Sequence, residues 1–279
     1  SSDVFDRMTG SVGIALRDER AYFETRVRLY NRTSERRSFL WWENAAVPAG
    51  PELRIFFPQD VGHVFFHYRR NTAAYPVAGG WFNGHKIPEN TDIRRHGNTP
   101  FPTSYFSAAS RFDYFGSYDE RTGGGVVHVA DHHISPGKKM FTWAYDQLAR
   151  TWEKALTDTD GPYLELMAGS YSDNQPDFSW LAPYEEKRFS QYWYPINDTG
   201  VPCFANLDMA VSVCSDRVVI RPTGTFADCE IVVRDEKREI ARETASLEVS
   251  QNHVTKFVGD VIGEVRITVQ SAGKTLVDY

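Results

Sequence analysis

Alternating apolar and polar residues run through most of the first 196 positions of the chain. In Ala21–Asn31, for example, positions 23, 25, 27 and 29 carry Phe, Thr, Val and Leu, while positions 24, 26 and 28 carry Glu, Arg and Arg. This period of two is typical of a β-strand with one wetter face. The same reasoning predicts further strands at Ser38–Val47, Leu53–Phe57, Val126–Ile134, Lys139–Trp143, Tyr163–Ala168 and Lys187–Tyr194.

Two segments depart from this pattern. At Asp146–Ala155 the spacing predicts a short helix, with Asp146 as its N-cap. Thr72–Thr103 is rich in Gly, Pro, Asn and His and has only weak periodicity. We therefore expect a long loop there, and a loop of that length inside a compact domain is usually functional or mobile.

The composition changes near Asn197–Ala205. Beyond residue 206 only Phe226, Phe257 and Tyr279 are aromatic, and short strands alternate with polar turns. We expect a large β domain over residues 1–204, followed at 205–279 by a small immunoglobulin-like β sandwich of the seven-strand type. The predicted fold class is all-β.

Charge and hydropathy exclude several classes of partner. The net charge is −6 and there is no basic run, so we expect no nucleic-acid partner. The apolar runs are too short to span a membrane, and the polar first residues carry no signal-peptide pattern. The three cysteines, an odd number without metal spacing, are expected to be reduced thiols, which favours a cytoplasmic setting. The polar start and strand-like end suggest a piece of a longer polypeptide.

Glu165 is the first candidate for chemistry, because it stands in an otherwise apolar strand. Leu164, Leu166 and Ala168 share one face of this strand, and Tyr163, Glu165 and Met167 share the other. If the apolar face lies on the core, Glu165 points to the opposite side of the sheet as a candidate general acid or base. The alternative is an ion pair with an Arg or Lys of a neighbouring strand.

His128 to His133, with the sequence HVADHH, is the second candidate. In an extended strand, His128 and His132 face one way while Asp131 and His133 face the other. One ion cannot take all four from such a strand, so we predict no metal site and no cofactor. His132 or His133, together with Asp131, is instead expected to be the proton-transfer partner of Glu165; packing is the alternative.

Aromatic and amide side chains supply candidate binding residues. Trp42, Trp143 and Trp180 are expected to stack on a ligand, although most aromatic residues in a β sandwich fill its core. A polar loop adds Asn174, Gln175 and Asp177, whose amides and carboxylate can pair with sugar hydroxyls or, equally, cap the backbone of a turn.

Four passages resemble a bacterial family of unknown function: WWENAAV, HVADHHISPGKK, DGPYLELMAG and DNQPDFSWLAPYE, within about residues 10–200. Members of that family sit N-terminal to tetratricopeptide repeats. The resemblance implies a C-terminal repeat region beyond these 279 residues.

Residues 27–47 and 164–194 also resemble strands of galactose mutarotase-like proteins. That resemblance implies a supersandwich with a carbohydrate pocket on its concave face. Glu165 would match the catalytic base, and Asn44, or Glu43, stands where those enzymes carry an acid histidine. Asparagine cannot donate the catalytic proton, so the acid would have to be His132 or His133.

Three functions are compatible with these residues. The first is acid–base chemistry on a saccharide, as in a glycoside hydrolase or a sugar epimerase, with Glu165 as the central group. The second is a non-catalytic carbohydrate-binding module of a larger repeat protein. The third is a protein-interaction scaffold, which predicts a Glu165 neutralised by an arginine.

Overall fold

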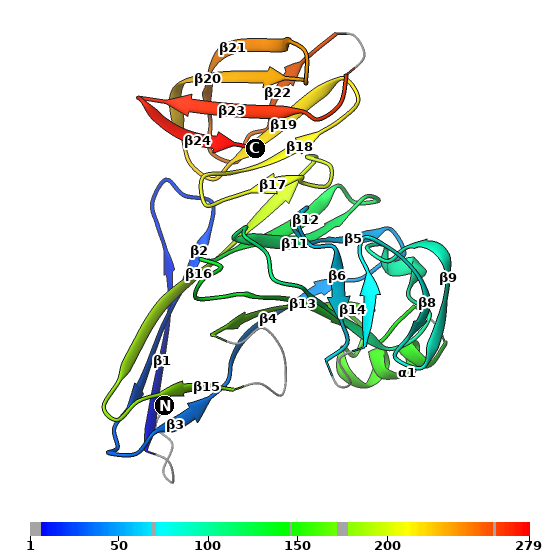
Figure 1. The fold of residues 1–279 in the computed structure, drawn as a ribbon, viewed down its shortest axis with the longest axis vertical. Helices are drawn as coiled ribbons and strands as arrows, with labels where there is room; N and C mark the ends of the chain where they lie inside the picture. Colours follow the sequence, from blue (N-terminus) through cyan, green and yellow to red (C-terminus); the bar gives the residue numbers. More distant parts are fainter. Residues whose placement is uncertain (1–6, 68–70, 146, 172–177, 259–260) are drawn as a thin grey trace.

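The computed structural model describes residues 7–67, 71–145, 147–171, 178–258 and 261–279. β structure dominates these residues, and the all-β fold class expected from the sequence is confirmed. Within the described ranges there is one α-helix, α1 (Gln147–Leu156), and one short 3-10 turn, η1 (His96–Asn98). A larger β body is built from the first part of the described chain and a smaller one from its last part, one above the other along the long axis (Figure 1).

Two six-stranded antiparallel sheets form the larger body. The first has the order β1 (Met8–Leu16), β2 (Phe23–Asn31), β16 (Glu186–Asn197), β12 (Gly124–Val129), β11 (Tyr114–Asp119) and β5 (Leu53–Phe56). The second, which we call the site sheet, has the order β4 (Trp41–Pro48), β14 (Tyr163–Ser170), β13 (Gly137–Thr142), β10 (Thr103–Ser107), β6 (His63–Phe65) and β7 (Thr72–Ala74).

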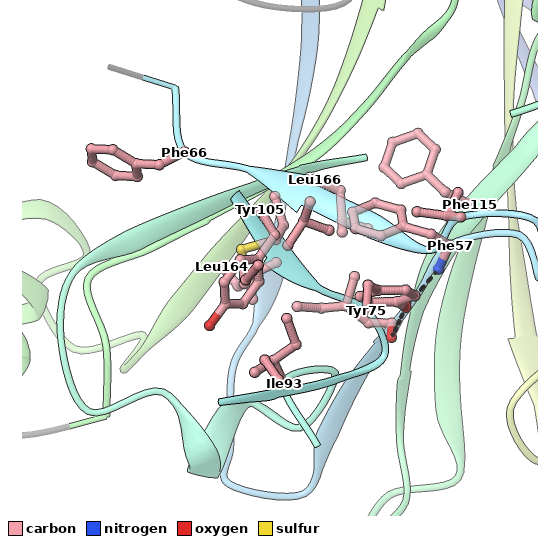
Figure 2. Close-up of a cluster of buried hydrophobic side chains, with 14 of the residues drawn as sticks. Phe57, Phe66, Tyr75, Ile93, Tyr105, Phe115, Leu164 and Leu166 are labelled. Carbon is pink, nitrogen blue, oxygen red and sulfur yellow. Dashed lines mark hydrogen bonds between the residues drawn. The ribbon is translucent and has the colours of Figure 1, made fainter. Parts of the chain in front are cut away.

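The main hydrophobic core lies between these two sheets. Leu164 and Leu166 of β14 are fully buried and belong to one cluster with Phe115 of β11 and Trp193 of β16. Figure 2 shows Leu164 and Leu166 among the surrounding aromatic rings. Because side chains alternate along a strand, this packing leaves the other face of β14 pointing away from the core.

Two predicted strands end differently from their sequence pattern. Ser38–Val47 is divided at Leu40 into β3 (Arg37–Phe39), which pairs with β15 (Ser179–Leu181), and β4. The strand predicted at Val126–Ile134 ends at Val129, because the chain then turns. The histidines that follow Val129 therefore lie in a turn and not in an extended strand.

The prediction of a long loop at Thr72–Thr103 is wrong. The segment contains β7, the hairpin β8 (Val77–Phe82) and β9 (His85–Asp92), and the start of β10. Asn83 and Gly84 form the two-residue turn with φ of 49° and 76°, the geometry for which an Asn-Gly pair is the usual signal. Phe82 and Ile87 are buried, but too few apolar residues alternate here to reveal the strands.

The smaller body has two four-stranded sheets. Its described residues thus form eight strands, whereas the sequence predicted a seven-strand sandwich. One has the order β17 (Phe204–Ala205), β18 (Met209–Val213), β19 (Arg217–Pro222) and β22 (His253–Lys256); the other has β21 (Glu239–Leu247), β20 (Phe226–Arg234), β23 (Arg266–Ser271) and β24 (Lys274–Asp278). Ile220 and Ile231 are central in its core. The division at 204/205 falls inside β17 and stays a prediction.

Two smaller expectations concern cysteines and membranes. Cys203, Cys214 and Cys229 are free, and Cys229 is buried. Among the described residues, no helix has the length and apolar character needed to cross a bilayer.

Candidate functional site on the site sheet

Glu165 lies on the outer face of the site sheet. Its neighbours Leu164 and Leu166 are fully buried on the opposite, core-facing side, whereas Glu165 is half-buried. Asn44 and Ala46 of the adjacent strand β4 share the outer face and are exposed. The alternation predicted for this strand is therefore confirmed, and the carboxylate is accessible.

The partners of Glu165 are neutral. The Asn44 side-chain amide donates to Oε2 at 3.2 Å, and the Tyr163 hydroxyl donates to Oε1 at 3.5 Å. Trp143 Nε1 in turn donates to the Tyr163 hydroxyl at 3.2 Å. Among the residues that the structure describes, no Arg or Lys forms an ion pair with Glu165, so this carboxylate keeps its capacity to accept further hydrogen bonds.

An aromatic wall stands beside this carboxylate. Trp143 stacks on Trp152 of α1, with ring centroids 4.7 Å apart and planes 15° apart, and Phe141 packs edge-on against Trp143 at 5.1 Å. Trp152 remains 43% exposed. The predicted helix is thus present over Gln147–Leu156, and it places an exposed indole next to the site. The N-cap predicted at Asp146 falls outside the described residues.

Trp42 is on the same sheet, but one face of its ring is covered by the Lys139 side chain. The Lys139 ammonium lies 2.9 Å from the centre of its ring and 4.3 Å from that of Phe106. Burial, followed by the nearby charge of Lys139, lowers the pKa of His67, whose Nδ1 contacts the Ser104 hydroxyl at 2.8 Å. The Lys139 ammonium thus forms a cation–π contact with Trp42, and the ring face that it covers is not free to stack on a sugar.

Asp131, His132 and His133 lie in a turn after β12. The His132 and His133 ring centroids are 3.9 Å apart, so the expectation that these side chains point to opposite sides is wrong. His132 Nδ1 contacts Asp113 Oδ1 at 2.7 Å, and His133 Nδ1 contacts Asp131 Oδ1 at 3.0 Å. The turn removes the strand geometry on which the exclusion of a metal was based.

The structure does not bring these histidines to Glu165. The turn is attached to the end of β14, where the Tyr171 N–H donates to the Ile134 carbonyl at 2.7 Å. Tyr171 is six residues along from Glu165, roughly 20 Å at the rise of an extended strand. The printed partners of both histidine rings are carboxylates near the turn. The acid–base pair predicted for Glu165 is therefore not formed with His132 or His133.

The remaining predicted binding residues lie elsewhere. Trp180 is on β15 and 47% exposed, and its ring is stacked under the Arg36 guanidinium at 5.0 Å. β15 pairs with β3 rather than with the site sheet. This pair meets the far end of β14, where Phe39 of β3 packs edge-on against Tyr171, six residues from Glu165. The predictions for Asn174, Gln175 and Asp177 fall outside the described residues.

A buried polar cluster between the two large sheets had not been predicted. Thr25 donates to Glu43 at 2.6 Å, and Gln191 contacts His128 Nε2 at 3.2 Å. Lys138 is almost fully buried, and its ammonium has no hydrogen-bond partner in the described part of the chain. The available signal was polar residues at core-facing positions of otherwise apolar strands.

Burial shifts the protonation of this cluster. Removal from water lowers the pKa of His128 to about 3, and the nearby Lys138 charge adds to that effect. Burial likewise lowers the pKa of Lys138 to about 8, although Asp113 and Asp60 oppose the shift. Burial raises the pKa of Glu43 against the effect of its bond from Thr25. The interior thus disfavours the charged form of each of these three groups.

A separate hollow of about 1260 Å³ lies beside α1, and Glu165 is not part of its wall. Its lining includes Tyr145, Arg150, Lys154 and Pro162. Large volume alone does not identify a site, and the convergent hydrogen-bonding groups are at Glu165.

Most of the chain matches a known protein family. The model of a family described as "Domain of unknown function (DUF5107)" matches residues 1–196. The chain belongs to the DUF5107 family. The family resemblance predicted from the sequence motifs is thereby confirmed.

Solved structures of known proteins give a second comparison. A TPR-domain containing protein from Parabacteroides distasonis is 25% identical, with a TM-score of 0.60 over 73% of this chain and 32% of its own. The chain thus spans about a third of that protein's length. Putative aldose 1-epimerases from Klebsiella pneumoniae (9% identity, TM-score 0.47, 71% of this chain and 49% of that one) and Escherichia coli K12 (11%, 0.46, 71% and 63%) are also similar. At these TM-scores neither epimerase bears on the chemistry of the site.

Proposed function

We propose that the outer face of the site sheet, around Glu165, binds a saccharide. The observation that carries this proposal is a half-buried carboxylate bonded to neutral partners, Asn44 and Tyr163, beside a stacked Trp143–Trp152 pair. Sugar hydroxyls require both donors and acceptors, which a carboxylate and an amide supply together. The apolar faces of a sugar ring suit an aromatic surface, so the two kinds of group complement each other.

Binding without turnover is supported better than acid–base chemistry. Catalysis on a saccharide requires a proton donor and a proton acceptor, both within reach of the reacting atoms. The histidines expected to be that donor are bonded to Asp113 and Asp131 instead. The scaffold hypothesis predicted a Glu165 neutralised by an arginine, and no such pair occurs among the described residues.

Acid–base chemistry remains the second candidate, because of one specific contact. Trp143 donates to the Tyr163 hydroxyl, and that hydroxyl in turn faces Glu165 Oε1. Tyr163 would then be the proton donor and Glu165 the base. Under this candidate, Tyr163→Phe abolishes turnover of a saccharide while leaving its binding measurable.

We expect Glu165→Gln to weaken saccharide binding by roughly 10- to 100-fold, since hydrogen bonds to a charged group contribute about 1.5–3 kcal/mol. The measurement is titration calorimetry with glucose, galactose, mannose, lactose and maltose, followed by NMR of anomeric exchange for any sugar that binds. Glu89→Gln is the matched control, because Glu89 is exposed on β9 of another sheet. A wild-type protein that binds none of the sugars, or a Glu165→Gln variant with unchanged affinity, contradicts the proposal.

The TPR-domain containing protein suggests the setting of the domain. That protein contains a TPR domain. We propose that repeats also accompany this chain, on its C-terminal side, and that the whole protein is cytoplasmic. The saccharide site would then be one module of a larger chain, with the repeats supplying contacts to other proteins.

A further inference from the structure

The turn at residues 131–135 holds two imidazoles and a carboxylate together at the surface. The Ile134 and Ser135 N–H groups both donate to the Asp131 carbonyl, at 3.0 and 2.7 Å, which closes the turn. The His132 and His133 rings then lie next to each other, with centroids 3.9 Å apart and their planes tilted by 38°. This arrangement is set by the backbone of the turn and is independent of Glu165.

Carboxylates hold both rings by the same nitrogen. Asp113 accepts from the His132 backbone N–H at 2.8 Å and faces His132 Nδ1 at 2.7 Å. Asp131 does the same for His133, at 2.9 and 3.0 Å. A carboxylate oxygen only accepts, so the hydrogen is assigned to Nδ1 and the lone pair of Nε2 points away from the carboxylate.

The Asp113–His132 pair has the hydrogen-bonding pattern that surrounds metal-bound histidines, in which a carboxylate orients the ring through its second nitrogen. One ligand atom each from Asp131, His132 and His133 lie within 4.8 Å of one another. Two ligand atoms on one ion lie up to roughly 4.2 Å apart when the metal–ligand bonds are about 2.1 Å. His133 is 77% exposed and Asp131 57%, so both side chains have room to turn. For all three groups to meet one ion, Asp131 must leave His133 Nδ1 and become a ligand itself, because a carboxylate on Nδ1 lies on the opposite side of the ring from Nε2.

We propose that His132, His133 and Asp131 form a binding site for a divalent transition-metal ion of the zinc class, with Asp113 as the residue that positions His132. Two imidazole nitrogens and one carboxylate oxygen suit Zn²⁺, Ni²⁺ or Cu²⁺, whereas Mg²⁺ and Ca²⁺ prefer oxygen ligands alone. Solvent completes the coordination, because the turn is exposed.

The test is titration calorimetry of the whole chain, without an affinity tag, against ZnCl₂, NiCl₂ and MgCl₂. We expect one Zn²⁺ or Ni²⁺ per chain and no saturable Mg²⁺ binding. His132→Ala and His133→Ala should each weaken Zn²⁺ binding at least tenfold, and Asp113→Asn by about tenfold, as for other residues that orient a metal ligand. His85→Ala is the matched control, since His85 is exposed on β9, in the separate sheet of β8 and β9, and should leave the affinity unchanged.

A second readout identifies the ligands directly. Added Zn²⁺ should shift the imidazole NMR signals of His132 and His133 and leave those of His63 and His85 in place, while melting curves verify that each variant is folded. The proposal is overturned if Zn²⁺ does not bind by millimolar concentration. It is equally overturned if the His132→Ala/His133→Ala double variant retains wild-type affinity.

Discussion

Replacing His128 with glutamine is expected to remove a large part of the acid sensitivity of the fold. His128 is buried against Phe115 and Trp193, with ring centroids 5.0 and 4.6 Å away. Its pKa is lowered from 6.5 to about 3 by burial. Between these values the unfolded chain binds a proton that the native chain does not, so stability falls as the pH falls from about 6.5 towards 3.

The expected size of this effect is large. The full shift corresponds to about 5 kcal/mol, of which roughly 3 kcal/mol is reached at pH 4.5. Urea unfolding at pH 7 and pH 4.5 measures it: wild type should lose about 3 kcal/mol more than His128→Gln on acidification. His63→Gln, a change at an exposed histidine, should lose as much as wild type. Equal losses in wild type and His128→Gln would show that His128 is not the responsible group.

Lys138→Met is expected to stabilise the protein at neutral pH. Lys138 is buried, without a hydrogen-bond partner for its ammonium among the described residues, and its pKa is lowered from 10.5 to about 8. Most of the native chains therefore carry a buried charge at pH 7. Methionine has a similar shape and no charge, so we expect a gain of about 1–3 kcal/mol, as for other buried charges replaced by apolar groups.

The pH dependence provides an independent check. Between about pH 8 and 10.5 the unfolded chain holds the Lys138 proton and the native chain has released it, so wild-type stability should rise with pH through this range. Lys138→Met should lack this rise, whereas Lys86→Met, a change at an exposed lysine of β9, should retain it. A less stable Lys138→Met variant would mean that the ammonium makes a favourable interaction that outweighs its burial.

Local sequence patterns predicted the structure correctly where the environment of a residue depends on its neighbours along the chain. The alternation at Tyr163–Ala168 correctly placed Leu164 and Leu166 in the core and Glu165 on the opposite face, because side chains alternate strictly along a strand. The short helix was found for a similar reason. The hairpin at Asn83-Gly84 was missed although its turn signal is local, since the strands beside it have few buried residues.

Local patterns failed where a strand ended earlier than its composition suggested. The predicted strand continued through His133, whereas β12 ends at Val129 and the chain turns. One misplaced boundary reversed the relation of Asp131, His132 and His133, because strand geometry separates neighbouring side chains while a turn gathers them.

The sequence by itself determined the family, the all-β class and the face of β14 on which Glu165 stands. Only the tertiary structure decided which side chains meet there: Asn44 reaches Glu165 across 121 positions, and the expected histidines lie elsewhere. It also decided that His128 and Lys138 are buried. The physical reason is that alternation along a strand follows from local geometry, whereas contacts between strands depend on pairing and register over long separations.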